Sequence, residues 1–242
     1  MKQLFENYTK EDFLVWKTLF EQQVENLKQK SCTEYLSCLN ELVSVLNADS
    51  IPRFEELNKV LKTTTGWTVE VVPGLIPVDE FFVLLSQQKF CSSTWLRKMK
   101  QLDYLEEPDM FHDIFGHIPL FIDKKFADFA KKMGDLGVKY AGNEKVLTQL
   151  QRIYWFTIEF GLVEQNGVKL YGAGIMSSFG ESNFVYTKEP ELLPFNLEQI
   201  INTDFCNSEI QTKYFVMNSF NQLFDALNQY EKTLALTNQE VL

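Results

Sequence analysis

The chain has 242 residues, of which 45% are hydrophobic, enough for one large core or at most two modest ones. Its formal net charge of -10 argues against binding to the phosphate backbone of a nucleic acid, which requires clustered Lys and Arg. It contains no run of 18 apolar residues, and its charged start, MKQLFENYTKEDF, is unlike a signal peptide, so we expect a cytoplasmic protein without a membrane span.

The predicted elements are mostly helices. Thr9 and Asp12 form a capping pair for a first helix, in which apolar residues recur at helical spacing as far as Leu27. Further helices are predicted over residues 33–47, from 51 onward, and over 79–90, 93–100, 123–137, 143–161 and 208–235.

Strand signals are few. Residues 68–72 are rich in Val and Thr and are followed by Pro73-Gly74, which indicates a short strand. Residues 162–171 predict a hairpin around Asn166-Gly167, a pair typical of a tight turn between two strands. The chain is therefore predicted to be mainly α, a single compact helical domain over residues 1–242 with a small β-hairpin and short strands.

The four cysteines, Cys32, Cys38, Cys91 and Cys206, show no C-x-x-C pairing and lie in apolar or helical contexts. We expect reduced, buried thiols, as is usual in a cytosolic protein, and not a zinc site.

Both histidines of the chain, His112 and His117, fall in the stretch PDMFHDIFGHIPLF. Residues five apart on an α-helix lie about 140° from each other, so the pair could not bind one ion from a regular helix. Gly116 and Pro119 predict that the helix ends there and that the chain turns back, which would bring the imidazoles together. The alternative is that both are core histidines with ordinary hydrogen-bond partners.

A third candidate ligand is Glu159, in the middle of the apolar segment 153–162. A buried carboxylate must be paired, protonated or bound to a metal. Its partner would be Arg97 or Arg152, or else a cation shared with the two histidines. Two His and one carboxylate form the facial triad of non-haem Fe(II) oxygenases, whereas zinc on the same ligands would make a hydrolase.

The aromatic surroundings of the three residues favour the oxygenase. They suit an oxidising centre kept from water and an aromatic substrate. The neighbouring aromatic side chains in the sequence are Phe111, Phe115, Phe121, Tyr154, Trp155, Phe156 and Phe160.

Three motifs, EEPDMFHDIFGHIPLF, IYWFTIEFGL and YGAGIMSSFGE, occur in one order along the chain. In these motifs the chain resembles the catalytic domain of the pterin-dependent aromatic amino acid hydroxylases, and it is most similar to the compact bacterial phenylalanine 4-monooxygenases. The resemblance covers nearly the whole chain. It implies a monooxygenase that hydroxylates the ring of an aromatic amino acid with O2, chiefly L-phenylalanine to L-tyrosine.

The resemblance also implies cofactors and site residues. Fe(II) would be held by His112, His117 and Glu159, with tetrahydrobiopterin or a related tetrahydropterin as cosubstrate. The pterin would lie on Phe81, near the backbone of Gly74, Leu75 and Ile76, beside Asp113 and Tyr154. The α-carboxylate of the substrate would pair with Arg97, which Asp109 would hold, since guanidinium binds carboxylate in a bidentate way.

The substrate ring would pack among Pro108, His112, Trp155 and Phe160. Ser177 and Glu181 would support the amino acid end and the ligands, with Ser177 orienting a ligand imidazole.

The chain departs from the family at three places. Leu105 replaces a Thr near the substrate backbone, Pro77-Val78 replaces a Ser-rich pair near the pterin, and the polar Asn207 aligns with a position linked to substrate choice. Tyrosine or tryptophan as substrate, or a non-catalytic homologue that binds an amino acid or pterin, are the alternatives to a phenylalanine hydroxylase. Since the chain has no room for a regulatory domain or a tetramerisation helix, we expect a monomer.

Overall fold

The computed structural model describes residues 1–102 and 107–239. The α-helices are α1 (Lys10–Leu27), α2 (Thr33–Glu41), α3 (Phe54–Thr64), α4 (Val78–Ser86), α5 (Lys124–Lys139), α6 (Glu144–Tyr154), α7 (Ala173–Met176), α8 (Phe179–Phe184), α9 (Leu197–Ile201) and α10 (Phe220–Gln239). Short 3-10 helices are η1 (Phe5–Asn7), η2 (Met99–Gln101) and η4 (Ile118–Ile122), and two π-helical turns are η3 (His112–His117) and η5 (Trp155–Glu159). The strands are β1 (Thr68–Val71), β2 (Lys89–Ser92), β3 (Leu162–Glu164), β4 (Val168–Leu170), β5 (Glu191–Pro194) and β6 (Lys213–Met217).

The first helix begins where its capping pair predicts. Thr9 Oγ accepts the backbone N–H of Asp12, and the Asp12 carboxylate accepts the backbone N–H of Thr9 at 2.8 Å, which satisfies two otherwise free donors. One face of α1 then buries Val15, Trp16 and Leu19 in the core. The helix expected over 123–137 is confirmed as α5, and its start is capped by Asp123.

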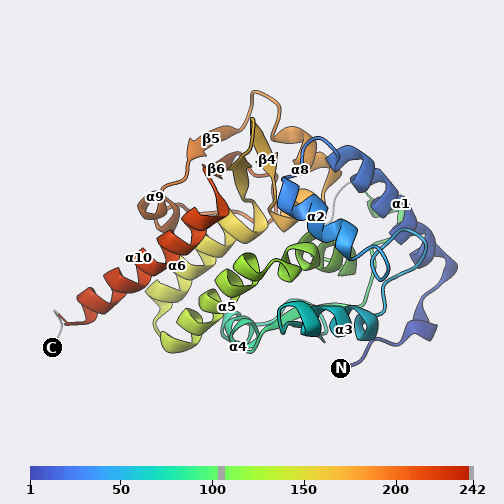
Figure 1. The fold of residues 1–242 in the computed structure, drawn as a ribbon, viewed down its shortest axis with the longest axis horizontal. Coiled ribbons are helices and arrows are strands. Elements are labelled where there is room, and N and C mark those ends of the chain that lie inside the picture. The colour runs from blue at the N-terminus through green and yellow to red at the C-terminus, as the bar shows by residue number, and fades with distance from the viewer. Residues whose placement is uncertain (103–106, 240–242) are drawn as a thin grey trace.

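The helices pack as layers around one aromatic-rich core. Helices α5, α6 and α10 lie side by side, α3 and α4 cover one side, and α1 and α2 cover another (Figure 1). Close packing of α4 on α5 requires Gly137, because a Cβ there would lie 2.2 Å from Cγ of Phe82. The buried cluster runs from Val15 to Tyr230, so the described residues form a single domain, mainly α as predicted.

Two small sheets complete the fold. Strands β1 and β2 form a parallel pair, and a four-stranded sheet has the order β4-β3-β6-β5. The predicted hairpin is confirmed as the antiparallel pair β3–β4. Its turn has left-handed φ at Asn166 (56°) and at Gly167 (106°), a conformation that Asn and Gly adopt more readily than other residues.

Several predicted helices are wrong. Residues 89 and 90, expected at the end of a helix, belong to strand β2. Residues 93–98 have no regular secondary structure, and the helix expected over 33–47 ends at Glu41. The helix expected over 208–235 begins only at Phe220, because residues 213–217 form β6 between β3 and β5. Strand β5 was not predicted either, so three strands were missed. Each of β2, β5 and β6 pairs in parallel with a strand that is not its neighbour in a hairpin, and such pairing leaves only a short local pattern in the sequence.

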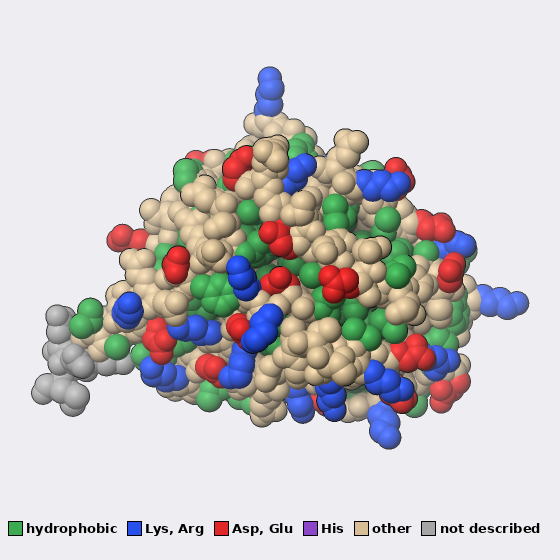
Figure 2. Space-filling model, viewed as in Figure 1, with side chains coloured by type: hydrophobic (Ala, Val, Ile, Leu, Met, Phe, Trp, Pro, Cys, Tyr) green, Lys and Arg blue, Asp and Glu red, His purple; other side chains and the backbone are tan. Residues whose placement is uncertain are grey.

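The described cysteines are all free thiols. Cys32 and Cys38 are buried as expected and Cys91 is partly buried, but Cys206 is exposed, so the prediction of burial is wrong there. None of the helices in the described residues is both long and apolar enough to cross a bilayer. On the face shown in Figure 2, Lys and Arg are interspersed with Asp and Glu.

Candidate metal centre

The two histidines lie at the two ends of one π-helical turn, η3. A π-helix bonds each residue to the fifth along the chain, so residues five apart lie about one turn from each other and share a face. The Nε2 atoms of His112 and His117 are therefore only 3.2 Å apart. The two imidazoles come together as predicted, but the predicted cause is wrong, since the helical winding does not end at Gly116.

The chain continues from η3 directly into η4, in which Pro119 occupies the first turn. Gly116 has a different role from the one expected. A Cβ at this position would lie 2.7 Å from the carbonyl oxygen of Ala173, so glycine allows η3 to pack against α7. This contact fixes the histidine-bearing turn against the helix that leads to Ser177.

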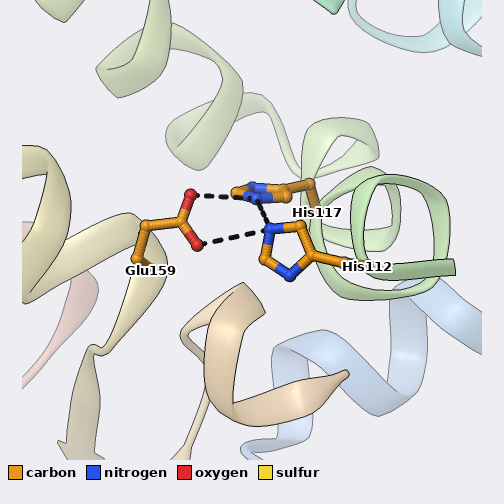
Figure 3. Close-up of side chains that lie close together, drawn as sticks. All are labelled: His112, His117 and Glu159. Atoms are coloured by element: carbon orange, nitrogen blue, oxygen red, sulfur yellow. Dashed lines mark hydrogen bonds and ion pairs between the residues drawn. The ribbon is translucent and has the colours of Figure 1, made fainter. Parts of the chain in front are cut away.

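Glu159 ends the second π-helical turn, η5, and points toward both imidazoles (Figure 3). Its Oε1 lies 3.1 Å from Nε2 of His117 and its Oε2 lies 3.6 Å from Nε2 of His112. The arginines considered as alternative partners bind elsewhere, Arg97 to Asp109 and Arg152 to Asp204. Burial by itself would raise the pKa of Glu159, but the charge of His117 and a hydrogen bond from it hold that pKa below its ordinary value.

Ser177 fixes the tautomer of His112. The Ser177 hydroxyl donates its only proton to the carbonyl of Ala173 at 2.8 Å. Its oxygen lies 2.9 Å from Nδ1 of His112 and must therefore accept the Nδ1–H proton, leaving the Nε2 lone pair directed at the centre. Burial lowers the pKa of His112 to about 4, so the imidazole stays neutral and able to bind a metal at neutral pH.

These three side chains fit one metal ion. Their donor atoms all lie within 4.8 Å of one another. Donor atoms about 2.1 Å from one ion and at right angles to each other are about 3 Å apart, close to the separations between the two imidazoles and the carboxylate. Because all three approach from one side, the remaining coordination positions would face open space, as in a facial triad.

Two adjoining cavities meet at this centre. The first, of about 260 Å³, is lined by all six residues expected to hold a pterin, namely Gly74, Leu75, Ile76, Phe81, Asp113 and Tyr154. The second, of about 300 Å³, is lined by the residues expected at the substrate, namely Arg97, Pro108, Trp155, Phe160, Ser177 and Glu181. His112, Glu159 and Trp155 line both cavities, so a ligand in either would lie beside the metal ligands.

Arg97 lines the second cavity, and its guanidinium is only partly hydrogen-bonded among the described residues. Its Nε and Nη2 each lie 2.9 Å from an oxygen of Asp109, and Nη1 donates to the carbonyl of Leu102 at 3.4 Å. A guanidinium has five N–H groups, so the partners among the described residues leave one on Nη1 and one on Nη2 without a hydrogen bond. Asp109 is fully buried and lines neither cavity; burial would raise its pKa, but its hydrogen bonds and ion pair with Arg97 lower it below its usual value.

Several lining residues were missed from the sequence. Phe90 packs on His117 at 4.6 Å, Cys91 lines the first cavity, and the backbone N–H of Ser93 donates to Asp113. Phe90 and Ser93 were missed because they fell in the helices predicted over 79–90 and 93–100, and Cys91 because it lay between them. The parallel strand β2 was not expected there. Burial raises the pKa of Asp113 well above its ordinary value.

Two of the three departures from the family fall at the cavities. Val78 lines the first cavity, and Asn207 lines the second. Leu105 lies outside the described residues.

We predict that Ser177→Ala weakens metal binding by about 10-fold to 100-fold, because the imidazole of His112 loses the partner that fixes its tautomer. Competition with a fluorescent Fe(II) chelator measures the affinity. Ser37→Ala, which alters an exposed serine on α2, is the matched control. Equal affinities in the wild type and in Ser177→Ala would show that Ser177 does not orient the ligand.

Comparisons of the sequence and of the structure with known proteins point to the same family. Residues 5–239 match the family of biopterin-dependent aromatic amino acid hydroxylases. Phenylalanine-4-hydroxylase of Chromobacterium violaceum is 43% identical over 228 residues, covering 93% of this chain and 76% of that protein. The human phenylalanine-4-hydroxylase is 34% identical over 232 residues, covering 94% of this chain and 50% of that protein.

A crystal structure of the C. violaceum phenylalanine hydroxylase superposes with a TM-score of 0.89 at 44% identity, covering 93% of this chain and 82% of that one. That structure holds iron(III) and the oxidised cofactor 7,8-dihydrobiopterin.

Proposed function

The chain belongs to the biopterin-dependent aromatic amino acid hydroxylases, and we propose that it converts L-phenylalanine to L-tyrosine with O2, Fe(II) and a tetrahydropterin. One observation carries the proposal. The cluster of His112, His117 and Glu159 lies where two cavities meet, so a cofactor in one and an amino acid in the other would both reach the same metal ion. The named activity of the bacterial relatives at 40–43% identity supports phenylalanine as the substrate.

The metal ion and the pterin would be held by two sets of residues that line the first cavity. His112, His117 and Glu159 would hold Fe(II), and Phe81, Tyr154, Asp113 and the backbone at 74–76 would hold the pterin. When both are bound, iron and reduced pterin supply the electrons that activate O2 for insertion of one oxygen atom into an aromatic ring.

The residues of the second cavity would bind and orient the amino acid. The guanidinium of Arg97 would pair with the α-carboxylate, and Asp109 would keep the guanidinium in place. Pro108, Trp155 and Phe160 would hold the ring beside the metal and keep water away from it. Glu181, fixed by Tyr214 and the backbone of Gln211, would border the amino end.

The test is direct turnover. Protein reconstituted anaerobically with Fe(II) would be mixed with a tetrahydropterin, air, and phenylalanine, tyrosine or tryptophan separately, and products identified by mass and chromatography. We expect tyrosine from phenylalanine as the main product. Hydroxylated tryptophan or tyrosine instead would keep the chemistry and change the substrate, and no product despite bound iron would indicate a protein that binds an amino acid or pterin without catalysis.

We also propose that the chain functions as a cytoplasmic monomer with a single catalytic domain. The three metal ligands converge within one chain, which supports the proposal of a monomer. Cys32 and Cys38 are free, buried thiols, the state that a reducing compartment maintains. Light scattering after gel filtration should give a mass of 28.3 kDa, whereas twice that mass would contradict a monomer.

A further inference from the structure

The indole of Trp155 is part of the wall that the two cavities share, and its position is fixed on several sides. The ring of Phe205 stacks on it with centroids 4.3 Å apart and planes 15° from parallel. The ring of Phe160 contacts it at 4.7 Å with a tilt of 39°. The remaining constraint is polar: Nε1–H of Trp155 donates to Oε1 of Gln211 at 3.0 Å.

Both ends of the Gln211 side-chain amide, and its backbone N–H, form hydrogen bonds. Its backbone N–H donates to Oε1 of Glu181 at 3.0 Å, and its Nε2 donates to the carbonyls of Cys206 at 2.7 Å and Glu209 at 3.1 Å. The side chain is only 7% exposed. The amide cannot be reversed, because its NH2 group would then face the indole N–H and its oxygen would face two carbonyl oxygens.

These contacts join the wall to the segment that covers it. The two donations from Nε2 close residues 206–209 into a compact turn, and this turn places Phe205 over Trp155. Phe205 lines the first cavity, whereas Asn207, Ile210 and Gln211 itself line the second. One amide therefore sets both the orientation of the indole and the position of the loop over it.

We propose that Gln211 is a positioning residue for the proposed hydroxylation, acting through Trp155 and through the loop of residues 205–209. The inference rests on the proposed function in that the second cavity receives the amino acid. A buried polar side chain with this set of partners is unnecessary for packing alone, since an apolar residue of similar volume would fill the space without needing hydrogen bonds. Its use here is to hold the aromatic wall in one orientation beside the substrate ring.

The test variant is Gln211→Met, which keeps the length of the side chain and removes its hydrogen bonds. We expect the KM for phenylalanine to rise about 10-fold or more, with a smaller change in kcat, because a wall displaced by a fraction of an ångström misplaces the ring. The tyrosine formed per pterin oxidised should fall below the wild-type ratio, and the iron content should not change. Gln229→Met, an exposed position on α10, is the matched control.

A second readout needs no turnover. In zinc-loaded protein labelled with 15N-tryptophan, the indole resonance of Trp155 is identified by its absence in Trp155→Phe. Gln211→Met should shift this resonance and speed its exchange with water. Isothermal calorimetry should show weaker binding of phenylalanine to the same zinc-loaded variant.

A double-mutant cycle separates positioning from simple stabilisation. In the Trp155→Phe background the indole hydrogen bond is already gone and only the bonds to the loop remain to be lost, so Gln211→Met should change the KM less than it does in the wild type. Equal changes in both backgrounds, or an unshifted indole resonance, would overturn the inference. If Gln211→Met does not fold, Trp155→Phe removes the same bond from the other partner, and an unchanged KM and product ratio in that variant would overturn it too.

The outcomes for Gln211 are distinguishable from those for the reaction. If the wild type forms no hydroxylated product, the proposed function fails, whereas the indole resonance and calorimetry still decide the role of Gln211. If the wild type forms tyrosine and Gln211→Met matches it in KM and product ratio, the inference about Gln211 fails while the function stands.

Discussion

Replacing His112, His117 or Glu159 with alanine is expected to abolish Fe(II) binding and hydroxylation while the fold persists. Each residue supplies one of three donor atoms that converge on one point, and two donors cannot form a facial triad. Loss of a partner that only orients a ligand costs about 10-fold to 100-fold in metal affinity, so loss of a ligand should cost more than about 100-fold. The fold should persist because all three variants keep every apolar side chain of the core cluster.

Iron content after anaerobic reconstitution, turnover with phenylalanine, and thermal unfolding followed by circular dichroism measure the three parts of this prediction. Glu55→Ala, which removes an exposed carboxylate of an ion pair on α3, is the matched control for Glu159→Ala. Iron retained at one equivalent, or turnover retained, in any of the three ligand variants would refute the assignment of that residue.

Arg97→Lys is expected to raise the KM for phenylalanine about 10-fold to 100-fold while leaving kcat and iron content close to the wild-type values. Lysine keeps the positive charge beside the buried Asp109, so the ion pair is weakened without leaving an uncompensated charge. It cannot reproduce the planar guanidinium, which would form hydrogen bonds with the α-carboxylate. Charge-assisted hydrogen bonds of this kind contribute about 1.5–3 kcal/mol.

A substrate analogue makes the prediction specific. Phenethylamine lacks the carboxylate, so its affinity should be the same in the wild type and in Arg97→Lys when both are measured by calorimetry. Arg53→Lys, at an exposed arginine beside Phe5, controls for a general effect of the substitution. An unchanged KM for phenylalanine, or an equal loss of affinity for phenethylamine, would show that Arg97 does not bind the carboxylate.

The sequence by itself determined which residues meet at the centre and what kind of chemistry they suit. Only two histidines occur, both in one apolar stretch, and Glu159 lies inside another apolar segment. Buried ionisable residues are costly unless they have a partner, so their presence in apolar segments indicates that they bind one another or a metal ion. The hairpin at Asn166-Gly167 was predictable for a similar reason, since a left-handed φ restricts the residue types.

The tertiary structure alone decided how these residues are brought together. The π-helical winding of η3 and η5 is not visible in apolar spacing, because the hydrogen-bonding pattern depends on packing against other segments such as α7. The strands β2, β5 and β6 were missed for a related reason, since each pairs in parallel with a strand that is not its neighbour in a hairpin. Gln211 was missed as well, because its partners Trp155, Glu181 and Cys206 become neighbours only when the chain has folded.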